Sequence, residues 1–227
     1  MSEYRHEYKY FLDTSQKAIL NIKAQVLLKK DCHVNNDNSY FVRSLYFDNI
    51  NNKCLDDNLI GSDPRSKYRI RYYNNNLSYI TLEKKTKYRG MCKKESIFLS
   101  KADCKKLIKG EIPTIKEKDS NIRKKLLTEL RINGMFPNTI VTYERIPYTY
   151  PIGNIRITFD DNITSSSDID HFLDGKYHQR SVLPLGQSLL EVKWDELIPK
   201  HIQNTIIMEN LNWTAFSKYY MSRLMHL

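Results

Sequence analysis

Basic residues recur at alternate positions in several extended stretches of this chain, and acidic residues join them in the same register. Arg69 and Arg71 form an R-x-R pair, and Lys193 follows Glu191 by two residues. A guanidinium group can donate two parallel hydrogen bonds to one phosphate, whereas a carboxylate supplies the oxygen ligand that Mg²⁺ or Mn²⁺ takes. This pattern predicts a site for a polyanion and a divalent metal.

The stretches that carry the pattern alternate between polar and apolar residues with the two-residue period of β-strands. We expect eight strands, at residues 3–12, 39–48, 66–73, 78–86, 92–99, 139–147, 154–160 and 188–194. Helices are expected at 14–30, 100–109 and 120–132, with one or two more within 201–225.

Turn and capping residues separate these elements. The run Asn74 to Asn76 lies between two expected strands as a hairpin turn does, so these strands should pair antiparallel. Thr14 or Ser15 should cap the first helix, and Ser100 the second.

The two faces of each expected strand differ in character. Arg156 lies on the opposite face from Ile155 and Ile157, and other strands divide in the same way. In a β-sandwich the apolar faces would meet and the charged faces would lie in water. The amphipathic helices favour a barrel, because their apolar stripes need the outer strand faces as partners. A bound polyanion and metal would offset the cost of charges inside it.

The fold expected is therefore α+β: a closed eight-stranded antiparallel β-barrel, or tunnel, with helices packed on its outside. A chain of 227 residues fits one domain over 1–227. Lys and Arg outnumber Asp and Glu by 36 to 26, and the isoelectric point is about 9.3. This charge attracts nucleic acid, anionic lipid and phosphate chains alike, so charge alone does not choose among them.

Hydropathy points to a cytoplasmic protein. No stretch approaches the roughly 18 consecutive apolar residues that cross a bilayer. The first residues, M-S-E-Y-R-H-E, are charged where a signal peptide would be apolar. We expect the protein to reach a membrane only through a separate membrane-protein partner.

Short motifs that combine these strand patterns occur in order along almost the whole chain. They are R-H-E-Y-K-Y at 5–10, V-R-S-L-Y-F-D-N at 42–49, K-Y-R-I-R-Y-Y at 67–73, I-T-L-E-K-K-T at 80–86, T-Y-E-R at 142–145, I-R-I-T-F-D at 155–160, L-L-E-V-K at 189–193 and F-S-K-Y at 216–219. Together they resemble the VTC domain, a polyphosphate polymerase domain of the triphosphate tunnel metalloenzyme, or CYTH-like, superfamily. The resemblance implies the same closed antiparallel β-tunnel.

The resemblance also implies roles for individual residues. The phosphate-binding and catalytic groups would be the basic residues of the motifs, with Ser217 as a further phosphate contact: Lys9, Arg69, Arg71, Lys85, Lys94, Arg145, Arg156, Ser217 and Lys218. Glu191 would hold Mn²⁺ or Mg²⁺. A one-residue register slip would replace Lys94 by Lys93. Glu7 and Glu83 share faces with Lys9 and Lys85. They could serve as secondary metal ligands, as general bases or as partners that orient the lysines, and we expect the last of these roles.

The function that the resemblance implies is that of an ATP-dependent polyphosphate polymerase, which transfers the γ-phosphate of ATP to a growing polyphosphate chain. A triphosphatase acting on inorganic triphosphate or nucleotides remains open, since water could replace the acceptor. A non-catalytic polyphosphate-binding module is a third reading, which Glu191 disfavours. No nucleic-acid partner is expected, because no RNP-type aromatic strand or Gly-rich clamp accompanies the basic residues. The sequence does not indicate an oligomeric state.

Overall fold

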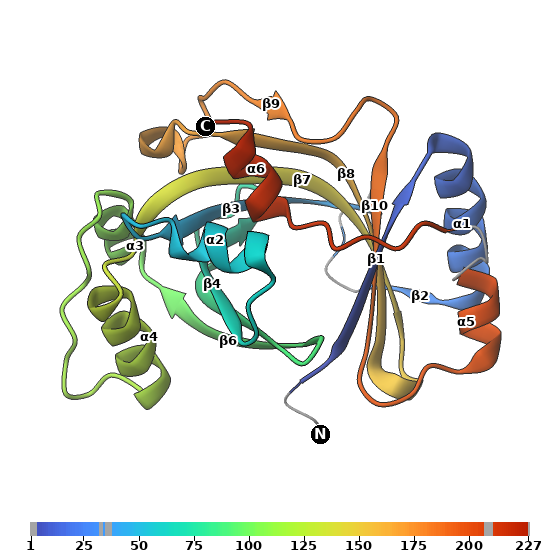
Figure 1. Ribbon diagram of the computed structural model, residues 1–227, viewed down its shortest axis with the longest axis horizontal. Coiled ribbons are helices and arrows are strands. Elements are labelled where there is room, and N and C mark those ends of the chain that lie inside the picture. The colour runs from blue at the N-terminus through green and yellow to red at the C-terminus, as the bar shows by residue number, and fades with distance from the viewer. Residues whose placement is uncertain (1–3, 32–33, 35–37, 207–210, 227) are drawn as a thin grey trace.

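An antiparallel sheet forms the centre of the structure, a computed structural model that describes residues 4–31, 34, 38–206 and 211–226 (Figure 1). Its strands lie in the spatial order β1 (His6–Leu12), β10 (Ser188–Trp194), β8 (Ile155–Ser166), β7 (Phe136–Tyr150), β3 (Tyr40–Asp48), β4 (Arg65–Tyr73), β5 (Ile80–Tyr88) and β6 (Met91–Leu99). Two short strands, β2 (Lys29–Lys30) and β9 (Arg180–Ser181), pair with β7 and β8.

The sheet curves into an open half-barrel, so the expectation of a closed eight-stranded tunnel is wrong. β1 and β6 are the two ends of the strand order. In the described part of the chain, the two ends are joined at one isolated bridge, in which Arg5, just before β1, and Cys92 of β6 exchange backbone hydrogen bonds of 2.9 and 2.8 Å. Farther along β1, Tyr10 bridges to Trp213 of the C-terminal segment instead. The edge of β1 therefore has different partners at its two ends, and β1 and β6 do not pair to close the barrel.

All eight expected strands are present, most of them within two or three residues of the expected bounds. β8 is the exception, because it continues to Ser166. The expected hairpin is confirmed: β4 and β5 pair antiparallel, with Arg69 opposite Glu83. Within β4, Tyr68 and Ile70 are buried on the outer face, as the alternation predicts.

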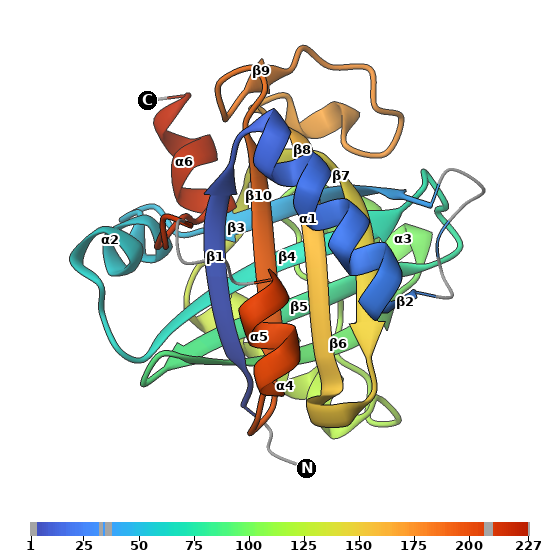
Figure 2. The same ribbon diagram turned by 90° about the vertical axis from the view of Figure 1, so that its right-hand side faces the viewer.

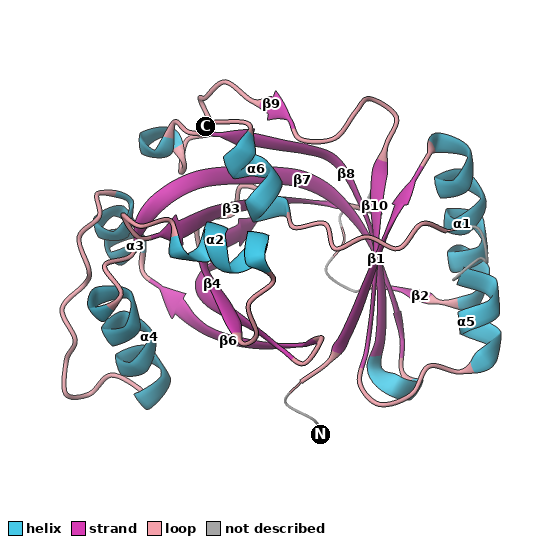
Figure 3. Ribbon diagram, in the orientation of Figure 1, coloured by secondary structure: helices cyan, strands magenta, loops and turns pink. Residues whose placement is uncertain are grey.

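Helices cover the outer face of the sheet and its rim (Figure 3). The described residues contain α1 (Thr14–Leu27), α2 (Lys53–Ile60), α3 (Lys101–Ile108), α4 (Asn121–Ile132), α5 (Lys200–Ile206) and α6 (Lys218–Leu224), with short 3-10 helices at Ile152–Asn154 and Ile169–His171. Figure 2 shows α1 and α5 on β1, β10 and β8, where Leu20 and Ile202 join Ile157 in one apolar cluster. None of the described helices has the length and hydropathy needed to cross a bilayer.

The ends of the first helix differ from the expectation. Asp13 caps α1, because its carboxylate accepts a hydrogen bond from the Gln16 amide (2.7 Å) while the Gln16 side chain accepts one from the Asp13 amide (3.0 Å). The cap thus precedes Thr14 by one residue. The helix ends at Leu27 because Lys29–Lys30 pairs with β7. The Ser100 cap of α3 is confirmed.

The C-terminal region contains two helices, as expected, whereas α2 is an addition to the expected set. Of the region expected to hold one or two helices, 201–225, residues 207–210 lie outside the described residues, and α5 and α6 flank them. Helix α2 was not expected. Its first amides donate to buried Asp48 at the end of β3, from Cys54 (2.8 Å) and Leu55 (3.2 Å). Asp48 also accepts a hydrogen bond from Tyr219 of α6, so one carboxylate anchors both helices to the sheet.

Candidate active site

The concave face of the sheet encloses a cavity of about 440 Å³. All the residues predicted for the site line it: Lys9, Arg69, Arg71, Lys85, Lys94, Arg145, Arg156, Glu191, Ser217 and Lys218. They come from seven strands of the sheet and from the start of α6, so residues more than 200 positions apart in the chain meet here. The structure brings the whole predicted set together, while the role of each residue stays a prediction.

Strand register explains why the charges point inward. Lys85 of β5 lies opposite Lys94 of β6, whereas Lys93 lies opposite Thr86. Cross-strand partners share a face of the sheet, so Lys94 faces the same side as Lys85, with no slip. The Lys94 ammonium lies 3.2 Å from Glu83. Lys93 also contributes to the cavity lining.

Glu191 is a buried residue of the cavity lining and lies among four basic side chains. Its carboxylate lies 2.8 Å from Lys218, 3.2 Å from Arg145 and 3.3 Å from Lys193, and Lys9 is 4.0 Å away. Burial alone would raise the pKa of the Glu191 carboxyl, but these cations together hold it well below its ordinary value. Glu191 is therefore a carboxylate, the form that a divalent metal requires.

Asp160 belongs to the same cluster and was not predicted as a site residue. It is completely buried, accepts two hydrogen bonds of 2.6 Å from Arg145, and lies 2.6 Å from the Lys218 ammonium. Arg145 and Lys218 are thus held between Asp160 and Glu191. The alternation of β8 could have identified Asp160, because it lies on the inward face with Arg156 and Thr158.

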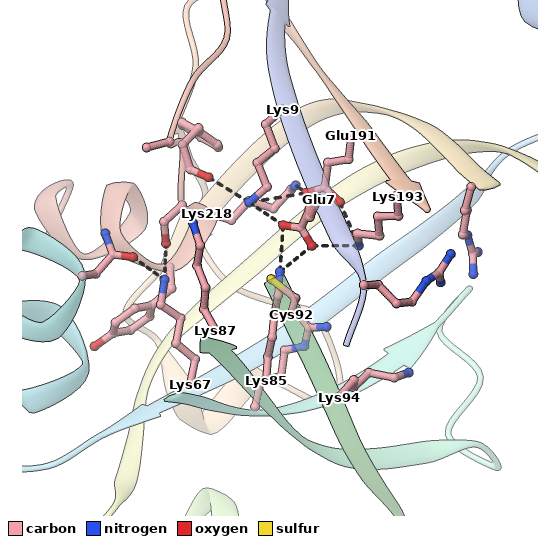
Figure 4. Close-up of a pocket in the computed structure, with 18 of the residues that line it drawn as sticks. Glu7, Lys9, Lys67, Lys85, Lys87, Cys92, Lys94, Glu191, Lys193 and Lys218 are labelled. Carbon is pink, nitrogen blue, oxygen red and sulfur yellow. Dashed lines mark hydrogen bonds and ion pairs between the residues drawn. The ribbon is translucent and has the colours of Figure 1, made fainter. Parts of the chain in front are cut away.

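Glu7 and Glu83 contact lysines and arginines of the cavity, as expected of orienting partners. Glu7 lies 2.6 Å from Lys85, 3.1 Å from Lys9 and 3.4 Å from Lys193 (Figure 4). Burial would raise the pKa of Glu7, but these three ammonium groups hold it well below its ordinary value.

Glu83 makes the corresponding contacts to the β4 arginines. It accepts a hydrogen bond of 2.8 Å from Arg69 Nε, and Arg71 Nη1 lies 3.9 Å from it. Despite burial, Arg69 and Arg71 lower the pKa of Glu83. Each arginine also donates to a tyrosine hydroxyl at 3.0 Å, Arg69 to Tyr46 and Arg71 to Tyr143. These contacts fix the two guanidinium groups on one face of β4 before any ligand arrives.

The remaining predicted residues have partners of a different kind. Arg156 lies 2.9 Å from Asp31 and donates to the Tyr40 hydroxyl at 2.8 Å. Ser217 accepts a hydrogen bond of 2.6 Å from Lys67, a cavity residue that had not been assigned a role. Its alternation with Arg69 and Arg71 already placed Lys67 on the same face.

Comparison with known proteins decides the family. The family model of the VTC domain matches residues 4–226. This range contains the described sheet and all ten predicted site residues. The chain belongs to the VTC domain family. The resemblance seen in the sequence is therefore confirmed. Comparison with curated proteins gave no match.

Solved structures share the fold of this VTC domain at low sequence identity. A Hippeastrum protein with a dominant triphosphatase activity aligns with a TM-score of 0.55 at 13% identity, over 99% of this chain and 96% of that one. A protein from Pyrococcus horikoshii aligns with a TM-score of 0.51 at 12% identity, over 98% of this chain and 99% of that one. At such identity the likeness establishes a common fold and nothing finer.

A metal ion would find few protein ligands in this VTC domain. Among the described residues, no group of three or more His, Cys, Asp or Glu side chains is arranged to hold one. Glu191 and Glu7 are the acidic residues that line the cavity, and both contact Lys9 and Lys193. The oxygen donors fit Mg²⁺ or Mn²⁺ chemically, provided that phosphate oxygens and water supply the rest of the shell.

The charge of the cavity is strongly unbalanced. Fourteen Lys or Arg residues and two Glu residues line it in the described part of the chain. Even with Asp160 and Glu83 behind them, positive charge remains in large excess. Such a cavity concentrates polyanions, because like charges confined at low dielectric are costly until counter-charges bind.

Proposed function

We propose that this VTC domain is a metal-dependent polyphosphate polymerase that transfers the γ-phosphate of ATP to the end of a polyphosphate chain. The observation that carries the proposal is the convergence of the ten predicted residues on one cavity with an excess of positive charge. Phosphoryl transfer depends on alignment and charge neutralisation more than on a nucleophilic side chain. A cavity of fixed arginines and lysines supplies both.

The arginines would align the phosphates. Arg69 and Arg71 lie two residues apart on β4 and would donate to oxygens of neighbouring phosphates. In the transfer, the bond between the γ-phosphorus and the β–γ bridging oxygen breaks, and a terminal oxygen of the polyphosphate forms the new P–O bond. ADP leaves with the bridging oxygen, whose developing negative charge the surrounding cations stabilise.

Glu191 would hold the metal, which when bound draws charge from the phosphate oxygens as a Lewis acid. To do so, Glu191 must release at least one of its present contacts to Lys218, Arg145 or Lys193. Asp160 makes this exchange possible, because it keeps Lys218 and Arg145 paired at 2.6 Å when Glu191 turns away. Asp160 would thus hold the two cations, while Glu191 would hold the metal.

A triphosphatase is the second candidate function. The Hippeastrum protein that shares the fold has a dominant triphosphatase activity. With the same cations in place, a water molecule that replaces the polyphosphate acceptor would release free phosphate. The product formed, polyphosphate or free phosphate, distinguishes the two acceptors.

Incubation with ATP and Mn²⁺, with free phosphate and polyphosphate both measured, tests the proposal. We expect ADP together with long-chain polyphosphate on a gel, and neither product when the metal is chelated. Free phosphate without polyphosphate would replace the polymerase by the triphosphatase. Tight polyphosphate binding with neither product would indicate the non-catalytic binding module.

A further inference from the structure

Two residues of the predicted site, Ser217 and Lys218, lie at the start of a helix, whereas the others lie in strands of the sheet. The helix, α6, has seven residues, and an isolated helix of that length is not stable in water. Its position therefore depends on contacts with its surroundings. Displacing a group that aligns a reactant by about 1 Å costs up to about a hundredfold in rate. The contacts that fix α6 to the sheet thus determine how well the Lys218 ammonium is placed.

Tyr219, the residue after Lys218, supplies one of these contacts. Its side chain is buried, and its hydroxyl donates a hydrogen bond to the Asp48 carboxylate. The same hydroxyl accepts a hydrogen bond of 3.1 Å from Arg223 Nη1, one helical turn further along α6. Arg223 in turn lies 3.5 Å from Asp48 and donates to Asn52 at 2.9 Å. The Tyr219 hydroxyl is therefore held both as a donor and as an acceptor.

Asp48 is a fixed point, because several backbone groups hold its carboxylate. It is completely buried at the end of β3 and accepts hydrogen bonds from the amides of Asn49 (2.9 Å), Cys54 (2.8 Å) and Leu55 (3.2 Å). Two of these amides belong to α2, which lies beside α6 (Figure 1). Tyr219 thus connects the helix that carries the predicted lysine to a rigid part of the sheet.

The connection through Tyr219 is independent of the proposed metal site, whereas the direct partners of Lys218 are not. The Lys218 ammonium lies 2.6 Å from Asp160 and 2.8 Å from Glu191. Metal binding by Glu191 would remove one of these two contacts. The hydrogen bond between Tyr219 and Asp48 involves neither acid. It therefore remains as a restraint on the start of α6 while Glu191 changes partners.

We propose that Tyr219 is a positioning residue for Lys218: its hydroxyl, held by Asp48, sets the distance between the Lys218 ammonium and a phosphate in the cavity. This inference rests on the proposed function, because it takes Lys218 as a phosphate contact. Packing alone would need only the Tyr219 ring, which lines the cavity 5.3 Å from the Tyr46 ring. The directional hydrogen bond to Asp48 fixes the orientation of the helix start as well. Removing the hydroxyl should therefore act on the ligand through Lys218.

A double-mutant cycle with Tyr219→Phe and Lys218→Met tests this assignment. Tyr219→Phe removes the hydroxyl and keeps the ring. The readout is the Kd of tripolyphosphate, measured by calorimetry without metal at one fixed ionic strength. We expect Tyr219→Phe alone to weaken binding about fivefold, the size of one net hydrogen bond, and to change it by less than about twofold in the Lys218→Met background. Tyr220→Phe is the matched control and should bind as the wild type does, because among the described residues the Tyr220 hydroxyl forms no hydrogen bond and lies outside the cavity lining.

The outcomes separate this inference from the proposed function. An equal loss of affinity in both backgrounds, or no loss in either, would overturn the positioning role and leave the proposed function standing. Failure of the wild-type protein to bind tripolyphosphate would overturn both. Coupled losses without polyphosphate formation from ATP would keep the positioning role and overturn the polymerase alone. A thermal melt checks folding, and if Tyr219→Phe does not fold, Arg223→Lys decides in the same cycle, since it removes the 3.1 Å bond to the same hydroxyl.

Discussion

Asp160 and Lys218 form a 2.6 Å ion pair in which the carboxylate is completely buried. Lys218 begins α6, whereas Asp160 lies in the middle of β8. The pair therefore fixes the C-terminal helix against the floor of the cavity. Removing one partner of a buried pair leaves the other charge without compensation.

Asp160→Asn should lower the free energy of unfolding by about 3 kcal/mol, because Arg145 and Lys218 both lose charge compensation. Urea unfolding measures the change. Asp161→Asn is the matched control. Asp161 forms a part-exposed ion pair of 2.7 Å with Lys17 and accepts a hydrogen bond from Ser188 that an amide oxygen can still accept, so the loss should be below about 1 kcal/mol. Equal losses of unfolding free energy would show that the buried cluster stabilises the fold no more than a part-exposed ion pair does. Added polyphosphate should recover more stability in Asp160→Asn than in the wild type.

Glu191→Gln should lower metal-dependent phosphoryl transfer by about a hundredfold or more, because it removes the principal carboxylate proposed to hold the metal. Polyphosphate binding without metal should persist or tighten, since a repulsive charge is lost. Product assays and metal-free calorimetry measure the two effects. Arg69→Ala should weaken binding with or without metal. Intact transfer in Glu191→Gln would require another metal ligand.

Glu7 should make stability depend on pH in the acid range. Its folded pKa lies well below the ordinary value of 4.5, because Lys85, Lys9 and Lys193 outweigh burial. A lowered pKa contributes stability that is fully present above pH 4.5 and is lost as the pH falls below it toward the folded pKa. The difference in unfolding free energy between wild type and Glu7→Gln should therefore be large at neutral pH and shrink in acid. A difference independent of pH would contradict the assignment.

Polyphosphate should raise the melting temperature by binding the folded state alone. Scanning fluorimetry would compare polyphosphate with chloride at equal ionic strength, since screening by itself relieves repulsion among the cavity cations. A shift matched by chloride would mean that the cavity attracts ions without a specific site.

The sequence predicted the cavity residues because their strands must bury one face. In β4, Tyr68 and Ile70 require apolar partners on the outside, and this requirement turns Arg69 and Arg71 inward. The same reasoning could have found Asp160, which the motif comparison passed over. The expectation of one domain over 1–227 stays a prediction.

Closure of the barrel could not be predicted in this way, because it depends on contacts between distant segments. The pairing of Tyr10 with Trp213 occupies part of the β1 edge that a closed barrel would give to β6. Helix α2 was not predicted for a similar reason, since amides of its first turn donate to buried Asp48 of β3. Alternation within one strand carries no information about either contact.

The open barrel, in which β1 and β6 do not pair, affects how a polymer chain would enter and leave the cavity. A complete ring must be threaded by a free chain end and then retains its polymer mechanically, even when attraction is weak. An open half-barrel does not enclose a chain completely, so it would hold a polymer mainly by electrostatic attraction, which weakens as salt ions compete. A polymerase built this way would make shorter chains at higher salt, with little change in the rate of each addition, and product lengths on a gel would show it. Its processivity would be set by the ionic medium.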